Sequence, residues 1–215
     1  FLNDELAIEV LKKKGKADVV TANNVFAHLD DIRNFTTNVK KILKDEGLFV
    51  IEAQYLLDTI QRNTFDNIYH EHFSYYSVTS LNKFFNDNGM QIIKVKHFDS
   101  HGGTIRVYVQ NEGRNHKIDE SVTEFLANEE ADGIKDFSTY RKFSEEIQRK
   151  KEKLRQTIIK LKKEGKQIIG YGAPAKATTS LNYFGIDNTY IDYTIEDNPL
   201  KQGKLIPGVR IPIKG

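Results

Sequence analysis

The 215-residue sequence predicts an α/β fold that contains two strand–helix–strand units. In the first unit, β-branched runs at 17–22 and 48–53 flank an amphipathic stretch at 32–44. In the second, a strand at 166–173 is followed by a helix and by another strand at 190–197. Strand, helix and strand with tight connections form a βαβ unit, which implies a parallel sheet with a right-handed crossover.

The composition is typical of a soluble globular protein, with 39% hydrophobic and 29% charged residues. The net charge of +2 argues against a protein that binds nucleic acid mainly through phosphate contacts. No apolar run approaches the roughly 18 residues of a membrane span, and no signal peptide is visible. The absence of cysteine excludes disulfides and thiolate metal sites in this chain. We therefore expect a cytoplasmic protein that binds neither nucleic acid nor membrane.

The N-terminal elements follow from periodicity and end signals. Residues 3–14 predict an amphipathic helix that Gly15 ends. The run at 17–22 predicts a buried strand, and 32–44 has apolar residues at helical spacing. We expect a turn at 45–47 before the second strand.

The middle of the chain predicts two further helices and a pair of strands. Residues 56–67 look helical, and 77–89 has a Ser/Thr cap and ends at Gly89. The runs at 90–98 and 103–110 alternate as strands do, and the sequence "HGG" between them predicts a sharp turn.

The C-terminal part begins after a polar boundary at about 111–137. Residues 137–165 predict a long charged helix with one packed apolar stripe, and 174–185 begins the helix of the second βαβ unit. The chain starts without methionine and stops at "GVRIPIKG", which resembles the approach to another strand. We therefore expect an internal fragment of a longer protein.

Polar residues follow the first strand of the predicted sheet. Open α/β sheets bind ligands at the carboxyl ends of their strands. Ala22, Asn23 and Asn24 end the first strand, and His28 follows closely. An asparagine amide offers both a donor and an acceptor, so these residues are candidates for a ligand crevice. The alternative interpretation is ordinary loop and cap chemistry.

The stretch "IYHEHFSYYS" (68–77) concentrates groups suited to acid–base chemistry. A histidine titrates near neutrality, a carboxylate can orient it, and a tyrosine can donate to a developing oxyanion. Aromatic packing with hydrogen-bonded histidines is the alternative. A metal site is a third possibility, but His70 and His72 need further ligands, which His97, His101 and Glu52 can supply only through folding.

Two glycine-containing turns are also candidates. In "GYGAPAK", Gly170 and Gly172 let the backbone approach a ligand, the helix that follows offers free N–H groups to an anion, and Lys176 adds a charge. The match to the dinucleotide or P-loop fingerprint is poor, so a simple tight turn is the alternative. The glycines after His101 serve either a turn or the approach of His101 to a substrate.

Taken in order, these pieces resemble the sugar C-methyltransferase family, and the resemblance covers nearly the whole chain. It is carried by "ADVVTANNVFAHLDD", "GLFVIEAQYLLDTI", "FDNIYHEHFSYYS", "HGGTIRVYV", "IIGYGAPAKATTSLNYFGI" and "YTIEDNPLKQGKLIPG". The segments "YHEH" and "GYGAPAKA" are specific when they occur together at this separation.

The resemblance implies the C-terminal half of a Rossmann-like methyltransferase domain, followed by a smaller Rossmann-like α/β domain. It divides the chain into a partial cofactor domain at 1–112, a connector with a long helix at 113–165, and a truncated α/β domain at 166–215. The cysteines of the family's N-terminal zinc part, the glycine-rich turn of its cofactor domain and the acidic residue that holds the ribose are missing from this chain.

The resemblance also implies roles for residues of "IYHEHFSYYS". His72 would be the general base, Tyr69 and Glu71 would orient the sugar or stabilise charge, and Tyr75 could donate to an enolate oxygen.

Other residues would bind ligands. Asn23, Asn24 and His28 would face the methionine end of the cofactor or the acceptor. The glycine turn with Lys176, together with Glu196 and Asn198, would lie in the C-terminal part of the substrate cleft.

The implied activity is methyl transfer from S-adenosylmethionine to a carbon of a nucleotide-linked keto-deoxysugar, through an enolate that a base generates. Three rivals remain open: a methyltransferase of an oxygen or nitrogen acceptor, a silent nucleotide-sugar-binding module, and a metal-dependent hydrolase that uses His70 and His72.

Overall fold

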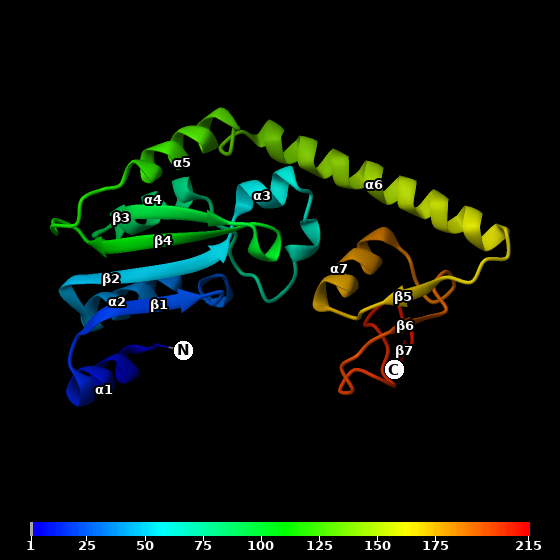
Figure 1. Ribbon diagram of the computed structural model, residues 1–215, viewed down its shortest axis with the longest axis horizontal. Coiled ribbons are helices and arrows are strands. Elements are labelled where there is room, and N and C mark those ends of the chain that lie inside the picture. Colours follow the sequence, from blue (N-terminus) through cyan, green and yellow to red (C-terminus); the bar gives the residue numbers. More distant parts are fainter. Residues whose placement is uncertain (1) are drawn as a thin grey trace. The chain divides into compact units, whose positions relative to one another are not determined.

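A computed structural model describes residues 2–215 as mixed α/β, which confirms the predicted fold class (Figure 1). The chain divides into two compact units. The first unit contains the described residues up to Arg62 together with Glu71–Thr139, and the second contains Asn63–His70 and Tyr140–Gly215.

The first unit contains a four-stranded sheet in the order β1-β2-β4-β3. The strands are β1 (Ala17–Asn23), β2 (Leu43–Gln54), β3 (Met90–Phe98) and β4 (Thr104–Asn111). β1 and β2 are parallel, while β4 is antiparallel to both of its neighbours. The strands β1, β2 and β3 therefore run in one direction, and their carboxyl ends meet at the edge where β4 begins. We call this the carboxyl edge of the first sheet.

Side chains at the helix ends account for where the first-unit helices start. The side chain of Asn3 accepts from the Leu6 N–H at the start of α1 (Asp4–Lys14). Asp31 accepts from the Asn34 N–H at the start of α2 (Ile32–Ile42). A Ser77 capping box opens α4 (Val78–Asp87), as the Ser/Thr signal predicted. Helix α1 ends at Gly15 with φ 74°, also as predicted.

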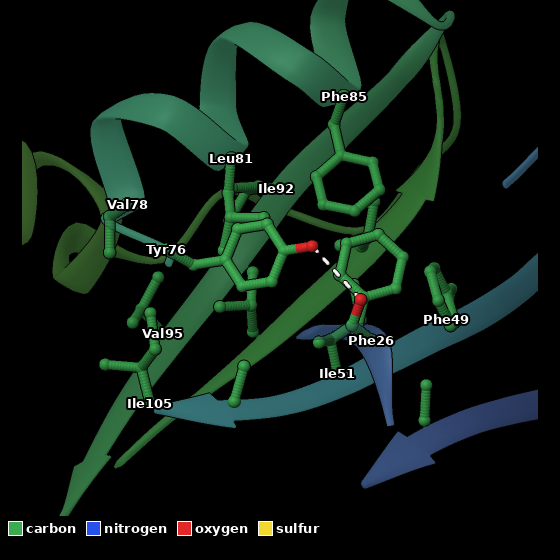
Figure 2. Packing of buried hydrophobic residues seen from close by; sticks show 14 of the residues in the cluster. Phe26, Phe49, Ile51, Tyr76, Val78, Leu81, Phe85, Ile92, Val95 and Ile105 are labelled. Atoms are coloured by element: carbon green, nitrogen blue, oxygen red, sulfur yellow. Dashed lines mark hydrogen bonds between the residues drawn. The ribbon is translucent and has the colours of Figure 1, made fainter. Parts of the chain in front are cut away.

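The core of the first unit is centred on Phe26, which has no exposed surface and belongs to the short helix η1 (Phe26–His28). Its ring centroid lies 5.3 Å from that of Tyr76 and 6.3 Å from that of Phe85. Figure 2 shows the Tyr76 hydroxyl pointing at the Phe26 carbonyl, to which it donates at 3.1 Å. The loop after β1 is therefore fixed by the core, which positions the residues that follow it.

A buried carboxylate joins two helices of the first unit. Glu129, on α5 (Glu120–Ala131), has no exposed surface and accepts the backbone N–H of Val78 at 2.6 Å and of Thr79 at 2.7 Å. These N–H groups of the first turn of α4 have no partner within the helix, and a negative charge is favourable there.

Burial and the Glu129 carboxylate hold the pKa of Tyr55 far above its ordinary value. The polar stretch at 111–137 thus contains a helix that the sequence did not predict.

Three predictions about the first unit were wrong in detail. β1 is an edge strand of the described sheet, and its Val19 is 53% exposed rather than buried. The expected turn at 45–47 belongs to β2, where the pairing with β1 shifts register. The expected helix at 56–67 divides into α3 (Leu56–Gln61) and a separate turn, η2 (Phe65–Asn67), which lies in the second unit.

The second unit contains a small parallel sheet in the order β5-β6-β7. The elements are β5 (Ile169–Tyr171), α7 (Ala175–Phe184), β6 (Tyr193–Ile195) and β7 (Ile213–Lys214). This confirms the second βαβ unit, with shorter strands than predicted. Its buried cluster comprises Ala173, Ile206, Val209, Ile211 and Ile213.

The long helix α6 (Phe137–Lys163) begins in the first unit and continues in the second. It buries Ile147 and Ile158 of the predicted stripe, whereas Leu154 of that stripe is 39% exposed. Contacts of η2 with α7 were not predicted: the Phe65 ring centroid lies 5.2 Å from those of Tyr183 and Phe184. Among residues 2–215, no helix combines the length and apolar character needed to cross a membrane.

Replacing Glu129 by Gln should destabilise the first unit, because a neutral amide cannot accept from both the Val78 and Thr79 N–H groups. We expect the free energy of unfolding in urea to fall by about 1–3 kcal/mol. The matched control is Glu130→Gln. Its side chain is 71% exposed in a pair with Lys135, and we expect a change within about 0.5 kcal/mol. Equal unfolding midpoints for both variants would contradict the capping role of Glu129.

Candidate active site

The carboxyl edge of the first sheet carries the predicted asparagines. Asn23 and Asn24 are exposed, and Asn24 has φ 52°, a left-handed conformation that asparagine tolerates better than most residues. The Asn24 N–H donates to the Glu52 carbonyl at 2.8 Å, which fixes the chain as it leaves β1. Ala22 is only 4% exposed and packs in the core, so its side chain is not available to a ligand.

The loop after β1 is held against the "YHEH" segment by two hydrogen bonds. Nδ1 of His28 lies 2.6 Å from the Glu71 carbonyl oxygen. Since a carbonyl can only accept, Nδ1 carries the proton of this bond. The Phe73 N–H donates to the Ala27 carbonyl at 2.9 Å. His72 therefore lies between two backbone anchor points.

These anchors bring His28, His72 and Tyr75 together. The ring centroids of His28 and His72 are 4.9 Å apart, with planes inclined at 42°. The His72 and Tyr75 centroids are 6.2 Å apart with nearly perpendicular planes. All three side chains are half-buried. Two imidazoles beside a phenol provide a proton acceptor and a hydrogen-bond donor at one place. These are the groups that general acid–base catalysis uses.

The other predicted members of the catalytic group are placed differently. The side chain of Glu71 is exposed, and its main-chain carbonyl, rather than its carboxylate, contacts His28. Tyr69 and His70 belong to the second unit, with ring centroids 6.1 Å apart. The described structure thus gathers His72 with His28 and Tyr75 within one unit, and places Tyr69 outside that unit.

The "HGG" turn also lies at the carboxyl edge of the first sheet. His101 is in the short helix η3 (Ser100–Gly102), is exposed and has φ 54°. Its carbonyl accepts from Nε2 of Gln54 at 3.3 Å, which ties the turn to the end of β2. The prediction of a sharp turn is confirmed.

Within the described residues, His70 and His72 are not joined by the further ligands that a metal site needs. Within residues 2–215, no group of three or more His, Asp or Glu side chains is arranged to hold a metal ion. His97, one of the candidate extra ligands, forms a hydrogen bond with the Asp58 carboxylate through Nε2. The carboxylate of Glu52 is paired with Arg106 at 2.6 Å.

The glycine turn of the second unit contains its own carboxylate. Glu196 follows β6 and accepts the N–H of Ala173 at 2.8 Å and of Asn198 at 3.1 Å. The Ala173 N–H bond is the largest cause that holds the pKa of Glu196 below its ordinary value, and Lys201 at 3.5 Å adds to it. The N–H group of Ala173 is therefore occupied by the protein itself.

The remaining second-unit candidates have mostly local roles. A β-carbon on Gly170 would lie 3.0 Å from Oγ1 of Thr194, so this glycine permits close packing of β5 on β6. Gly172 has φ 85°, as a tight turn requires. The Asn198 side chain accepts the Leu200 N–H at 3.0 Å. Lys176 is half-buried at the start of α7 and has no ion pair within the described residues.

Comparisons with known proteins match both parts of the chain. A family model described as a methyltransferase domain matches residues 3–95, and one described as a C-methyltransferase C-terminal domain matches residues 99–215. The chain is 36% identical over 209 residues to C-methyltransferase NovU of Streptomyces niveus, a match that covers 97% of this chain and 50% of that protein. The chain thus spans about half the length of this relative.

Solved structures give weaker likenesses. Magnesium protoporphyrin IX methyltransferase of Synechocystis PCC 6803 aligns with a TM-score of 0.37 and 11% identity over 48% of each chain. A SAM-dependent methyltransferase of Anabaena variabilis ATCC 29413 aligns with a TM-score of 0.39 and 9% identity, over 52% of this chain and 56% of that one.

The Glu196 contacts predict a pH dependence of stability. Because folding lowers its pKa, the ionised Glu196 stabilises the fold above the ordinary carboxyl pKa of about 4.3. This stabilisation is lost as the pH falls through the lower folded-state pKa. Glu196→Gln should therefore lower the melting temperature at pH 7 and flatten its fall between pH 5 and pH 3. Asp197→Asn, an exposed neighbour, is the control; parallel melting curves for wild type and Glu196→Gln would refute the assignment.

Proposed function

The chain belongs to the C-methyltransferase family, and from that premise we propose that it takes part in methyl transfer from S-adenosylmethionine to a carbon of a nucleotide-linked keto-deoxysugar. The observation that carries this proposal is the cluster of His28, His72 and Tyr75 at the carboxyl edge of the first sheet. The matched family model gives the class of reaction. The cluster provides the groups that removal of a proton from carbon requires.

The exposed asparagines fit one end of the cofactor. Asn23 and Asn24 each present an amide donor and an amide acceptor, which suit the amino and carboxylate groups of a methionine moiety. Asn24 has a left-handed backbone at the end of β1, and the side chains of both asparagines are exposed there. When bound, S-adenosylmethionine supplies an electrophilic methyl group on a sulfonium sulfur.

His72 is the proposed base. A ketone next to the target carbon acidifies its C–H bond, and an imidazole titrates near neutral pH. The C–H bond breaks, the proton passes to a ring nitrogen of His72, and the electron pair is delocalised as an enolate. That pair then forms the bond to the methyl carbon, while the electrons of the broken C–S bond remain on sulfur. His72 finally releases its proton to solvent.

Two neighbours support His72. The Tyr75 hydroxyl is a candidate donor to the developing negative charge on the enolate oxygen, a contribution of roughly 10²–10³-fold in rate for one well-placed donor. His28 packs beside His72, and its bond to the Glu71 carbonyl holds its own ring in one orientation. The backbone anchors on both sides of His72 limit its movement.

His72→Asn should abolish most methyl transfer, because the amide cannot accept the proton. We expect the turnover number of the intact protein to fall by roughly 10²–10⁴-fold, while affinity for a dTDP-linked keto-deoxysugar changes little. Transfer of labelled methyl from S-adenosylmethionine and calorimetry measure the two quantities. His70→Asn, two positions away, is the matched control; near-normal turnover in His72→Asn would remove His72 from the mechanism.

The product should carry a new carbon–carbon bond. NMR of the methylated sugar distinguishes a C–CH₃ group from the O–CH₃ or N–CH₃ group that a different acceptor atom would give. Calorimetry with S-adenosylhomocysteine separates an enzyme from a silent binding module, because only the enzyme binds both this compound and the sugar nucleotide. An O–CH₃ or N–CH₃ product would replace the C-methylation proposal with its rival.

A further inference from the structure

A buried carboxylate outside the His72 cluster binds a histidine at the same edge of the sheet. Asp58, on α3, is 6% exposed. Its Oδ2 lies 2.5 Å from Nε2 of His97, near the end of β3, and its Oδ1 lies 3.2 Å from Nε of Arg62. The His97 side chain is 34% exposed. A buried carboxylate that accepts from an imidazole fixes the orientation of the ring.

The same carboxylate packs against the "HGG" turn. A β-carbon built on Gly103 would overlap the Asp58 side chain, and Gly103 has φ 119°. Both observations make glycine necessary at this position. The Asp58 side chain therefore packs directly against the backbone of the turn at Gly103.

An ion pair between Arg62 and Asp99 holds the start of the turn. Arg62 donates from Nη2 to Oδ1 of Asp99 at 2.8 Å, and Asp99 immediately precedes η3. Arg62 thus connects Asp58 to the start of the turn, and His97 lies two residues before Asp99. The charged or titratable groups around His97 are Asp58, Arg62, Asp99 and the Tyr55 phenol.

Backbone bonds join the turn to the carboxyl end of β2. The Tyr55 N–H donates to the Gly103 carbonyl at 3.0 Å, and the Gly103 N–H donates to the Ser100 carbonyl at 3.0 Å. His101 is left-handed, a conformation that a non-glycine residue keeps only where its surroundings impose it. Such residues are concentrated at ligand sites. Here the imposed conformation exposes an imidazole at the edge that also carries Asn23 and Asn24.

We propose that the Asp58–His97 pair positions the Ser100–Gly103 turn so that His101 contacts the sugar acceptor. Asp58 and His97 are positioning residues, and His101 is the residue that touches the ligand. An exposed imidazole can donate to or accept from a sugar hydroxyl. The identity of the acceptor rests on the proposed function, whereas the positioning of the turn rests on the contacts of Asp58, His97 and Arg62 and on the backbone bonds of Gly103.

The first test measures the turn itself. The side chain of His97→Asn is too short to bond the Asp58 carboxylate. The amide nitrogen of His97→Gln lies near the position of Nε2 and can restore the hydrogen bond to Asp58. Hydrogen exchange of the Tyr55 and Gly103 amides should quicken at least tenfold in His97→Asn and return towards wild type in His97→Gln. His116→Asn is the matched control, since His116 bonds the Glu46 carbonyl near the opposite ends of the strands. Equal exchange in all three variants overturns the positioning.

The second test measures coupling to the acceptor in the intact protein. His97→Asn and His101→Ala should each raise the KM for a dTDP-linked keto-deoxysugar by roughly 10–100-fold, with a smaller change in kcat. The double variant should be no worse than either single one, because both changes remove the same contact. Additive effects, or a KM unchanged in His101→Ala, overturn the contact between His101 and the acceptor.

The two proposals fail in different ways. If the wild-type protein makes no C-methylated sugar, the proposed function fails, and the contact of His101 with a sugar acceptor fails with it. The exchange measurements then still decide whether Asp58 and His97 position the turn. If C-methylation occurs and the KM effects are absent, the proposed function stands and the role of His101 is overturned.

Discussion

The hydrogen bond from the Tyr76 hydroxyl to the Phe26 carbonyl is the constraint on which the candidate active site depends. It joins two segments that are 50 residues apart in the sequence, inside a core where both rings are almost fully buried. Burying a large apolar side chain contributes roughly 1.5–3 kcal/mol, and a hydrogen bond about 0.5–1.5 kcal/mol more. His28 lies two residues after one partner, and Tyr75 immediately precedes the other. Residues of the candidate site are thus placed directly beside residues that stabilise the core.

This arrangement explains how half-buried side chains can be held in position. The contacts among His28, His72 and Tyr75 are ring packing at 4.9–6.2 Å, which alone is weak. Their backbones, however, are fixed by the Phe73–Ala27 and His28–Glu71 hydrogen bonds and by the Tyr76 anchor. Catalytic groups need such support because small displacements reduce rates strongly.

The sequence predicted the elements whose signals are local and missed those that depend on distant contacts. Helix caps at Ser77 and Gly15 were correct because a cap is a relation between residues three or four apart. Helix α5 was missed because its polar residues include Glu129, whose burial depends on α4, about 50 residues earlier. The residues of the candidate site were named from their types. The pairing of His28 with His72 could not be predicted, because it depends on a side-chain-to-backbone bond across 43 positions and a backbone bond across 46 positions.

In the second unit, a local sequence pattern suggested a binding turn, but a residue distant in the sequence already bonds its backbone. The sequence "GYGAPAK" left two interpretations open, a turn whose N–H groups receive an anion and a simple tight turn, and Glu196 already accepts the Ala173 N–H and pairs with Lys201. A carboxylate in this position repels a second anion and satisfies the donor that the anion would use. Gly170 and Gly172 are then explained by packing on Thr194 and by backbone geometry. An anionic ligand in this unit would have to contact groups that Glu196 leaves available, such as the Lys176 ammonium.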